Sequence, residues 1–132
     1  MKRVQLNKII GGWSPVSFEM QDHPVFRELT EASLKVYIFC LRKSFRPHTD
    51  RYLVNFKFTY PEALNRLGLS NSTFLRAMKR LHSLGIIDYY SPGATRNKQM
   101  GAKRYQLSHR WKKWNTSDFE NHDEGWFVSV RG

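Results

Sequence analysis

Cysteine is nearly absent from this 132-residue chain, which contains only Cys40. A single thiol cannot form a disulfide bond within the chain, and it cannot supply the several sulfur ligands of a cysteine-based zinc finger. Because Cys40 lies in an apolar stretch that is expected to be helical, we predict a buried and unreactive thiol rather than a nucleophile.

Long hydrophobic runs are also missing from the sequence. No apolar stretch approaches the roughly 20 residues that a membrane-spanning helix needs, and the N-terminus lacks the pattern of a signal peptide. A basic chain is attracted to a membrane surface, but no expected helix carries its basic residues around an apolar face suited to insertion. We therefore expect a cytoplasmic protein with no membrane partner.

The sequence lacks the motifs of common catalytic sites, including the zinc-protease motif, the phosphate-binding loop and the nucleophile elbow. Residues 122–124 (His-Asp-Glu) carry possible metal ligands, but three adjacent residues seldom converge on one ion. A nuclease needs several acidic metal ligands near its basic residues, and the basic half of the chain offers only Asp88. We therefore predict no enzymatic activity, no cofactor and no metal site. The other histidines are expected at the surface or as helix caps: His23, His48, His82 and His109. Of these, His82 could also contact a phosphate.

Acidic residues are scarce, since 11 Asp and Glu oppose 22 Lys and Arg, giving a net charge of +11 and a pI near 10.1. The placement of the bases is more informative than their number. The stretch from Arg76 to Lys113 contains ten bases and one acid, a net charge of +9. A field so concentrated attracts a polyanion, and counterion release makes such binding sensitive to salt.

Local signals predict a short helix that begins after Thr59 and ends at Leu67. Thr59 and Glu62 have the spacing of a capping box, and Pro61 lies in the first turn, where a missing N–H costs nothing. Gly68 follows at the tight turn, where a residue without a side chain is favoured.

A second helix is predicted over residues 71–84, with Ser70 as its cap and Gly85 as its stop. On a helical wheel, its apolar residues share one arc and its polar residues lie opposite or on a flank. The apolar arc, expected in the core, contains Phe74, Ala77, Met78, Leu81 and Leu84.

The remaining pattern predicts one helix before this pair and three strands around it. Thr30 is expected to cap the first helix, which ends near Arg42-Lys43 and buries Leu34, Tyr37, Ile38 and Leu41. Alternating apolar residues predict a short strand over 54–58, and two further strands are expected at 86–90 and 103–107. A polar loop, residues 91–102, connects the last two strands.

This order of elements resembles a winged helix-turn-helix DNA-binding domain across roughly residues 24–114. The residues that carry the resemblance are those at 58–63 (FTYPEA), 67–70 (LGLS), 72–74 (STF), 81 (L), 84–87 (LGII) and 104–108 (RYQLS). Within that group the chain is most similar to small proteins of bacterial mobile elements, phages and plasmids, including replication-initiator-type domains. The resemblance implies an α+β, mainly α, winged helix-turn-helix fold, with three core helices, a small antiparallel sheet and a basic wing. It also implies sequence-specific binding of double-stranded DNA by a transcriptional regulator or replication initiator.

In such a motif the second helix enters the major groove, and its outer face reads the edges of the bases. Arg76 and Lys79 are candidates for guanine, and Asn71 for adenine or a phosphate. Arg96 or Lys98 of the wing could enter a minor groove, while Lys103 and Arg104 of the last expected strand contact phosphate. The predicted DNA contacts are Asn71, Ser72, Thr73, Arg76, Lys79, Arg80, Ser83, Arg96, Lys98, Lys103 and Arg104.

The predicted organisation is an N-terminal arm (1–22), the winged-helix domain (23–114) and an acidic, aromatic tail (115–132). Trp13 and Phe18 are expected to anchor the arm on the domain. Residues 116–132 carry a net charge of −3, so the tail could cover the basic face when DNA is absent. Deleting the residues after Asn115 should then tighten DNA binding. A homodimer through Trp13, Trp126 and the terminal segments is possible.

Three other interpretations remain open from sequence alone. The basic helix face could simply be solvated, or the same surface could meet an acidic protein partner. The chain could also bind RNA or a single strand, if Trp111 and Trp114 stack on exposed bases. We favour the two tryptophans as anchors in the core or at an interface.

Overall fold

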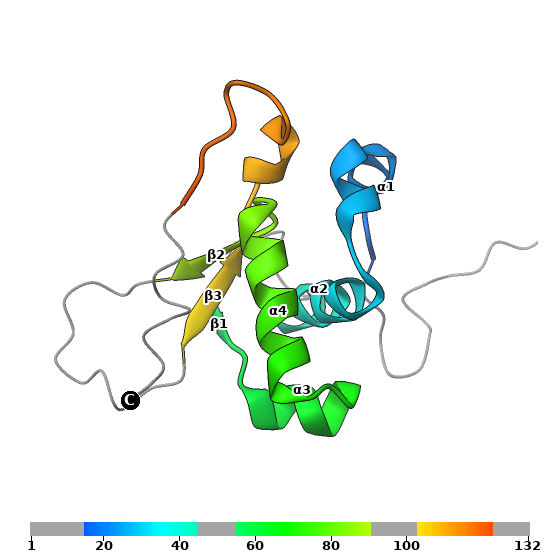
Figure 1. Cartoon of the computed structure of the whole chain (residues 1–132), viewed down its shortest axis with the longest axis vertical. Helices are drawn as coiled ribbons and strands as arrows, with labels where there is room; N and C mark the ends of the chain where they lie inside the picture. The colour runs from blue at the N-terminus through cyan, green and yellow to red at the C-terminus, as the bar shows by residue number, and fades with distance from the viewer. Residues whose placement is uncertain (1–14, 45–54, 91–102, 123–132) are drawn as a thin grey trace, which may run out of the picture.

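The chain forms an α+β structure that is mainly helical and contains a small antiparallel sheet of three strands. The computed structural model describes residues 15–44, 55–90 and 103–122. The elements, in order, are α1 (Phe18–Asp22), η2 (Pro24–Glu28), α2 (Glu31–Ser44), β1 (Phe56–Lys57), α3 (Tyr60–Leu67), α4 (Asn71–Ser83), β2 (Ile87–Tyr90), β3 (Arg104–Leu107) and η4 (Arg110–Lys113). Helix α4 packs against α2 and beside β2, α2 also contacts β3, and α3 lies at the foot of α4 (Figure 1). Over these ranges, each helix is too short or too polar to cross a bilayer.

The predicted turn between α3 and α4 is confirmed. The Thr59 hydroxyl accepts a hydrogen bond from the Glu62 amide at 3.4 Å and begins α3. Gly68 ends that helix with φ +70°, a left-handed conformation that favours glycine. Two residues later, the Ser70 hydroxyl accepts a bond from the Thr73 amide at 3.3 Å and begins α4. Local capping chemistry therefore sets the approach of the two helices.

Gly85 ends α4 and allows a close contact with η4. Its φ is +80°, and a Cβ atom at this position would lie 2.8 Å from the Cβ of Arg110 and from the backbone N of Trp111. The Trp111 amide donates to the Gly85 carbonyl at 3.0 Å, so the two backbones are joined at this point. Glycine is required here for its conformation and for the space that it leaves.

The buried face of α2 differs from the predicted one. Ile38 is 39% exposed, whereas two small polar residues, Ser33 and Ser44, are fully buried. The hydroxyl of Ser33 donates to the Thr30 carbonyl, and that of Ser44 to the Cys40 carbonyl. Because these hydroxyls bond to the helix's own backbone, serine can complete a buried stripe that a search for apolar residues misses. The buried residues of α2 are Ser33, Val36, Tyr37, Phe39, Cys40, Leu41 and Ser44.

Cys40 is fully buried, as the sequence predicts, and burial raises the pKa of its thiol far above the ordinary value. The thiol is therefore held in its neutral form, which is a poor nucleophile. The cap of α2 is also confirmed, because the Thr30 hydroxyl accepts a bond from the Ser33 amide at 3.1 Å.

The three strands are arranged in the order β1-β3-β2, with antiparallel pairing throughout. Phe56 pairs with Tyr105, and Ile87 pairs with Leu107, so the buried side chains of all three strands share one face. The predicted strands at 86–90 and 103–107 are confirmed within a residue. The predicted alternation at 54–58 is seen at Phe56 and Phe58, which are buried, while Val54 lies outside the described residues.

Phe18 does not anchor the N-terminal segment, because its side chain is 81% exposed. The Ser17 hydroxyl accepts a bond from the Met20 amide at 3.1 Å and starts a helical turn. That turn directs Met20 into the core, where it is 1% exposed. The prediction for Phe18 was wrong because the helical turn buries Met20 in place of Phe18. Trp13 lies outside the described residues.

Near the other end of the domain, Trp111 is 6% exposed in the core and Trp114 packs against that core. The Ser108 hydroxyl accepts a bond from the Arg110 amide at 3.1 Å, which fixes the turn that carries them. The two tryptophans are therefore core anchors, as favoured from sequence.

Candidate nucleic-acid interface

The outer face of α4 is polar and exposed over its whole length. Its inner arc is buried as predicted, with Phe74, Met78 and Leu81 at 3% exposure or less. Of the seven DNA contacts predicted on this helix, six are exposed, and Thr73 is half-buried beside the Ser70 cap. The six exposed residues are Asn71, Ser72, Arg76, Lys79, Arg80 and Ser83. One helix therefore separates a hydrophobic face from a face that carries three cations.

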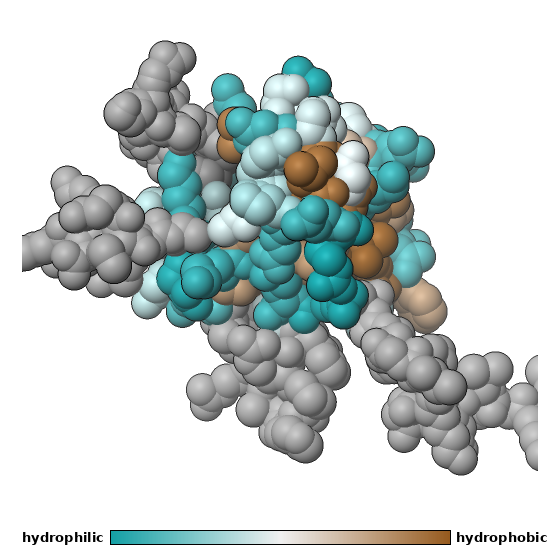
Figure 2. Space-filling view, turned by 90° about the horizontal axis from the view of Figure 1, so that it is seen from below, coloured by the Kyte–Doolittle hydropathy of each residue, from teal (hydrophilic) through white to brown (hydrophobic). Residues whose placement is uncertain are grey.

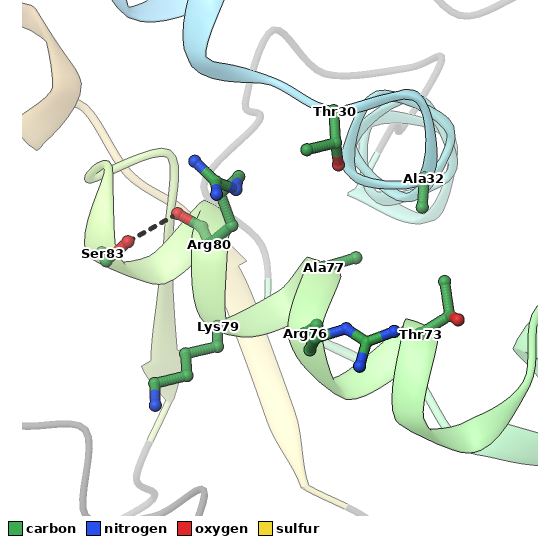
Figure 3. A pocket seen from close by; sticks show the side chains of 8 residues that line it. All are labelled: Thr30, Ala32, Thr73, Arg76, Ala77, Lys79, Arg80 and Ser83. Carbon is green, nitrogen blue, oxygen red and sulfur yellow. Dashed lines mark hydrogen bonds between the residues drawn. The ribbon is translucent and has the colours of Figure 1, made fainter.

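These cations differ in how they are held. Arg76 and Lys79 form no ion pair with another described residue, whereas Arg80 donates to the Glu28 carbonyl at 3.2 Å. Arg80 points from α4 toward the segment that precedes α2, and Lys79 points away from α2 (Figure 3). Two flanks of the helix thus carry positive charge, and one of those charges is fixed in position by a backbone bond.

An open groove of about 650 Å³ runs between the start of α2 and α4. Thr30 and Ala32 form one wall, and α4 forms the other with Thr73, Arg76, Ala77, Lys79, Arg80 and Ser83 (Figure 3). Viewed from the α3 end, hydrophilic side chains cover much of the described surface, with a smaller hydrophobic group to one side (Figure 2). Small side chains on the α2 wall leave the α4 cations accessible from this side.

The basic residues predicted on the last strand, Lys103 and Arg104, are more constrained than those of α4. Arg104 is half-buried, and its Nε donates to the side-chain oxygen of Asn55, while its Nη2 lies 3.4 Å from the Asn55 carbonyl. This arginine therefore helps to tie β3 to the segment before β1. Lys103 is also half-buried, and burial lowers the pKa of its ammonium. The predicted wing contacts, Arg96 and Lys98, lie outside the described residues.

Arg110 is a residue whose role the sequence does not reveal. Its side chain is 8% exposed, and its guanidinium lies 2.8 Å from the Asp88 carboxylate. It also donates to the His82 carbonyl at 2.9 Å and to the Glu120 carbonyl at 2.7 Å. Arg110 and Asp88 therefore neutralise each other inside the fold, and neither belongs to the free basic surface.

His82 is 2% exposed, so the expected surface position and phosphate contact are wrong. The residue follows Met78 by four positions and therefore falls on the inner arc of α4. His23 does act as a cap, because its Nδ1 accepts a bond from the Val25 amide at 3.0 Å. His109 is exposed as expected, and His48 lies outside the described residues.

A cluster that the sequence does not predict forms beside Arg110. One donor atom each from His82, Asp88 and His122 lies within 4.8 Å of the other two. The Nδ1 of His122 is 3.3 Å from the Asp88 carboxylate, and the rings of His82 and His122 have centroids 6.2 Å apart. His122 thus meets residues from α4 and β2, whereas its neighbours at 123–124 lie outside the described residues.

The described part of the tail, residues 115–122, lies near the C-terminal end of α4 and beside β2 (Figure 1). Its ion pairs join His122 to Asp88 and, at 3.9 Å, to Glu120. Neither Asp118 nor Glu120 pairs with a base on the outer face of α4. In this portion of the tail, the acidic residues do not cover the candidate interface.

Comparison of the chain with family models, with curated proteins and with solved structures finds no match.

Proposed function

We propose that this chain is a winged helix-turn-helix protein that binds double-stranded DNA in a sequence-specific manner. Helices α3 and α4 form the helix-turn-helix, α4 enters the major groove, and residues 91–102 serve as the wing on the backbone or minor groove. The observation that carries the proposal is the outer face of α4, where Arg76 and Lys79 are exposed and form no ion pair with a described residue.

The dimensions of α4 support this assignment. Thirteen residues give a helix about 20 Å long, and the major groove, about 12 Å wide, admits one helix. The outer positions Ser72, Arg76, Lys79 and Ser83 are spaced by three or four residues, so they lie along one side. Arg76 and Lys79 suit the acceptors of guanine, while Asn71, in the first turn, suits adenine or a phosphate.

Flanking residues supply the contacts that would position the helix. Arg80 and Ser83 border the groove beside α2, while Arg104 begins β3 and Lys103 directly precedes it. Contacts of this kind to phosphate carry no sequence information, but they set the register of the protein on the duplex. By resemblance, the bound DNA would belong to a promoter or replication origin of a bacterial mobile element.

Single-strand or RNA binding is a less favoured alternative. The two tryptophans that would stack on bases are occupied in the fold, since Trp111 is 6% exposed and Trp114 packs on the core. Binding of an acidic protein partner through the same α4 surface is the other alternative. The experiment below distinguishes these alternatives from duplex binding.

The test is selection of bound sites from random duplexes, performed with the full chain and two double variants. Arg76→Ala with Lys79→Ala removes the proposed readers. Lys35→Ala with Arg42→Ala removes equal charge from exposed positions of α2. We expect the wild type and the α2 variant to select the same motif and the α4 variant to lose it. A palindromic motif would also indicate a dimer. Equal selection by all three proteins, or tighter binding to single strands, would refute the proposal.

A further inference from the structure

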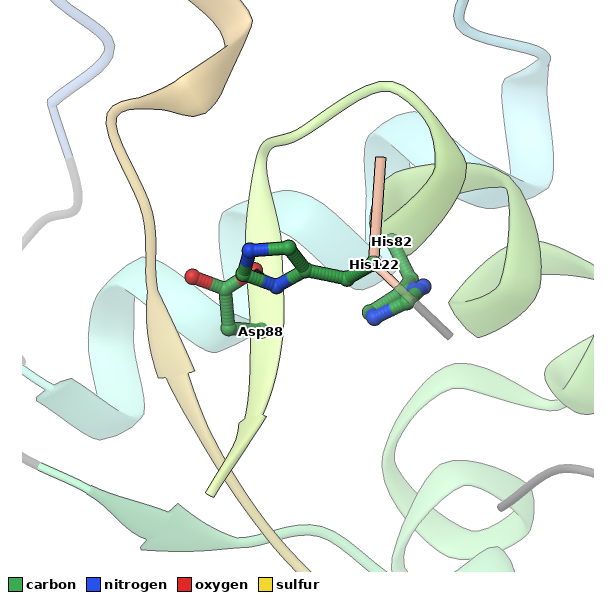
Figure 4. A group of neighbouring side chains, drawn as sticks. All are labelled: His82, Asp88 and His122. Atoms are coloured by element: carbon green, nitrogen blue, oxygen red, sulfur yellow. Dashed lines mark ion pairs between the residues drawn. The ribbon is translucent and has the colours of Figure 1, made fainter. Parts of the chain in front are cut away.

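The His82–Asp88–His122 cluster brings together three separate segments of the chain. His82 comes from the last turn of α4, Asp88 from β2, and His122 from the tail (Figure 4). Their donor atoms all lie within 4.8 Å of one another. Solvent exposure increases across the cluster: His82 is 2% exposed, while the side chains of Asp88 and His122 are 17% and 41% exposed.

We propose that this cluster binds one divalent transition-metal ion, with Zn²⁺ as the best match. Two imidazole nitrogens and a carboxylate oxygen form a donor set that zinc accepts at bond lengths of about 2.0–2.2 Å. Magnesium and calcium are poor matches, because both prefer oxygen donors throughout. Three protein ligands leave the fourth tetrahedral position to water, and the exposed side of His122 faces solvent.

The present spacing requires only a small contraction around an ion. Ligand atoms of a tetrahedral zinc site lie about 3.3 Å apart, as bonds near 2.0 Å imply. The pair formed by His122 Nδ1 and Asp88 Oδ1 is already at 3.3 Å. His122 is the most exposed of the three side chains and belongs to a surface segment, so it can move toward the ion without disturbing the core.

Arg110 orders the three segments before any ion is bound. It donates to the Asp88 carboxylate, to the His82 carbonyl at the end of α4 and to the Glu120 carbonyl two residues before His122. Outer residues that hold metal ligands in place are a regular part of metal sites. Both contacts of Arg110 with Asp88 use Oδ1, the oxygen that also lies 3.3 Å from His122 Nδ1, so Arg110 holds in place the oxygen that would face the ion.

The same geometry has a simpler explanation, in which His122 only pairs with Asp88 and docks the tail. This explanation predicts no stoichiometric metal binding. The proposal does not depend on DNA binding, because the three ligands lie apart from the outer face of α4. Metal binding and DNA binding can therefore fail independently.

The experiment titrates the full chain, prepared without an affinity tag, with Zn²⁺ by calorimetry and repeats the titration with Co²⁺ by absorption spectroscopy. We expect one ion per chain and the visible bands of four-coordinate cobalt. His122→Ala and Asp88→Asn should each weaken binding by about 100-fold or more, above the 10–100-fold cost of losing an outer-sphere partner.

His109→Ala is the matched control, since His109 is an exposed histidine outside the cluster. This variant should bind zinc as the wild type does. Thermal melting of each variant without metal checks that the fold is retained, and His122→Ala is the decisive variant because its side chain is the most exposed of the three. The proposal is overturned if the wild type binds no stoichiometric ion, if His122→Ala binds equally well, or if His109→Ala loses as much affinity.

Discussion

Arg76 and Arg110 belong to the same basic stretch of sequence, yet the fold places them in opposite environments. Arg76 is exposed on the outer face of α4 and forms no ion pair with a described residue. Arg110 is almost buried and is paired with Asp88 at 2.8 Å. The net charge of a segment therefore predicts the field around it, but not which of its cations a ligand can reach. That distinction depends on whether an acid and several carbonyls converge on a given guanidinium.

The largest expected effect separates the two arginines by stability. Arg110→Ala leaves the Asp88 carboxylate partly buried without its arginine partner, and breaking a buried pair in this way typically lowers the free energy of unfolding by about 3–5 kcal/mol. The side-chain exposures of 8% and 17% place this pair toward the buried end. Arg76→Ala should change stability by less than about 0.5 kcal/mol. Urea unfolding of both variants measures the difference, and equal losses would contradict the contrast.

The second effect concerns a buried group of another kind, the Tyr37 phenol, and appears as a loss of stability at alkaline pH. Burial, with a smaller contribution from Cys40, raises the pKa of Tyr37 from 10.0 to about 12. The folded state therefore favours the neutral phenol, so this contribution is intact below pH 10 and is lost as the pH rises toward 12. Two units of pKa correspond to about 2.7 kcal/mol. Tyr37→Phe should flatten the fall of unfolding free energy over that range. An unchanged profile would mean that Tyr37 does not titrate from a buried state.

A third effect tests the accessible cation directly. Arg76→Ala should relax the preference for one base of the selected site, with a loss of discrimination of about 1–3 kcal/mol. Binding to a panel of single-base variants of that site measures it. Lys57→Ala removes the same charge from an exposed position on β1 and should leave the order of preference unchanged. If both variants relax the same base position, Arg76 is not its reader.

The smallest expected effect concerns Lys103, which is half-buried and whose pKa is lowered by burial. The proposed role of Lys103 is a phosphate contact, which would carry no sequence information, so Lys103→Gln should weaken binding to all duplexes alike. The slope of log affinity against log salt should fall in magnitude by about 0.9 for one lost contact. A change confined to one sequence would assign Lys103 a role in base readout.

Much of the fold is predictable from sequence because its boundaries depend on neighbouring residues. The caps at Thr59 and Ser70 and the left-handed ends at Gly68 and Gly85 are local signals, and the structure has each of them in place. The amphipathic pattern of α4 likewise identifies its buried arc, since that arc depends only on helical period. The exposed residues of the candidate interface follow from the same period.

The features that sequence did not reveal depend on contacts between distant segments. Nothing near Arg110 in the sequence indicates its pairing with Asp88, 22 residues away. His122 meets His82 only because the tail returns to the end of α4. Ile38 and Phe18 were assigned to the interior by hydrophobicity, but the fold buries serines of α2 and Met20 instead. Small hydroxyl residues that bond to their own helix are weak signals in any hydrophobic pattern.

Because Gly85 contacts η4, replacing this glycine with alanine would affect residues well beyond position 85. The segment that rests on Gly85 carries Trp111, which fills the core, and Arg110, which joins α4, β2 and the tail. Any side chain at position 85 would push that segment outward and disturb both residues together. The lack of a side chain at position 85 therefore lets η4 lie against the end of α4, where Arg110 reaches His82, Asp88 and Glu120.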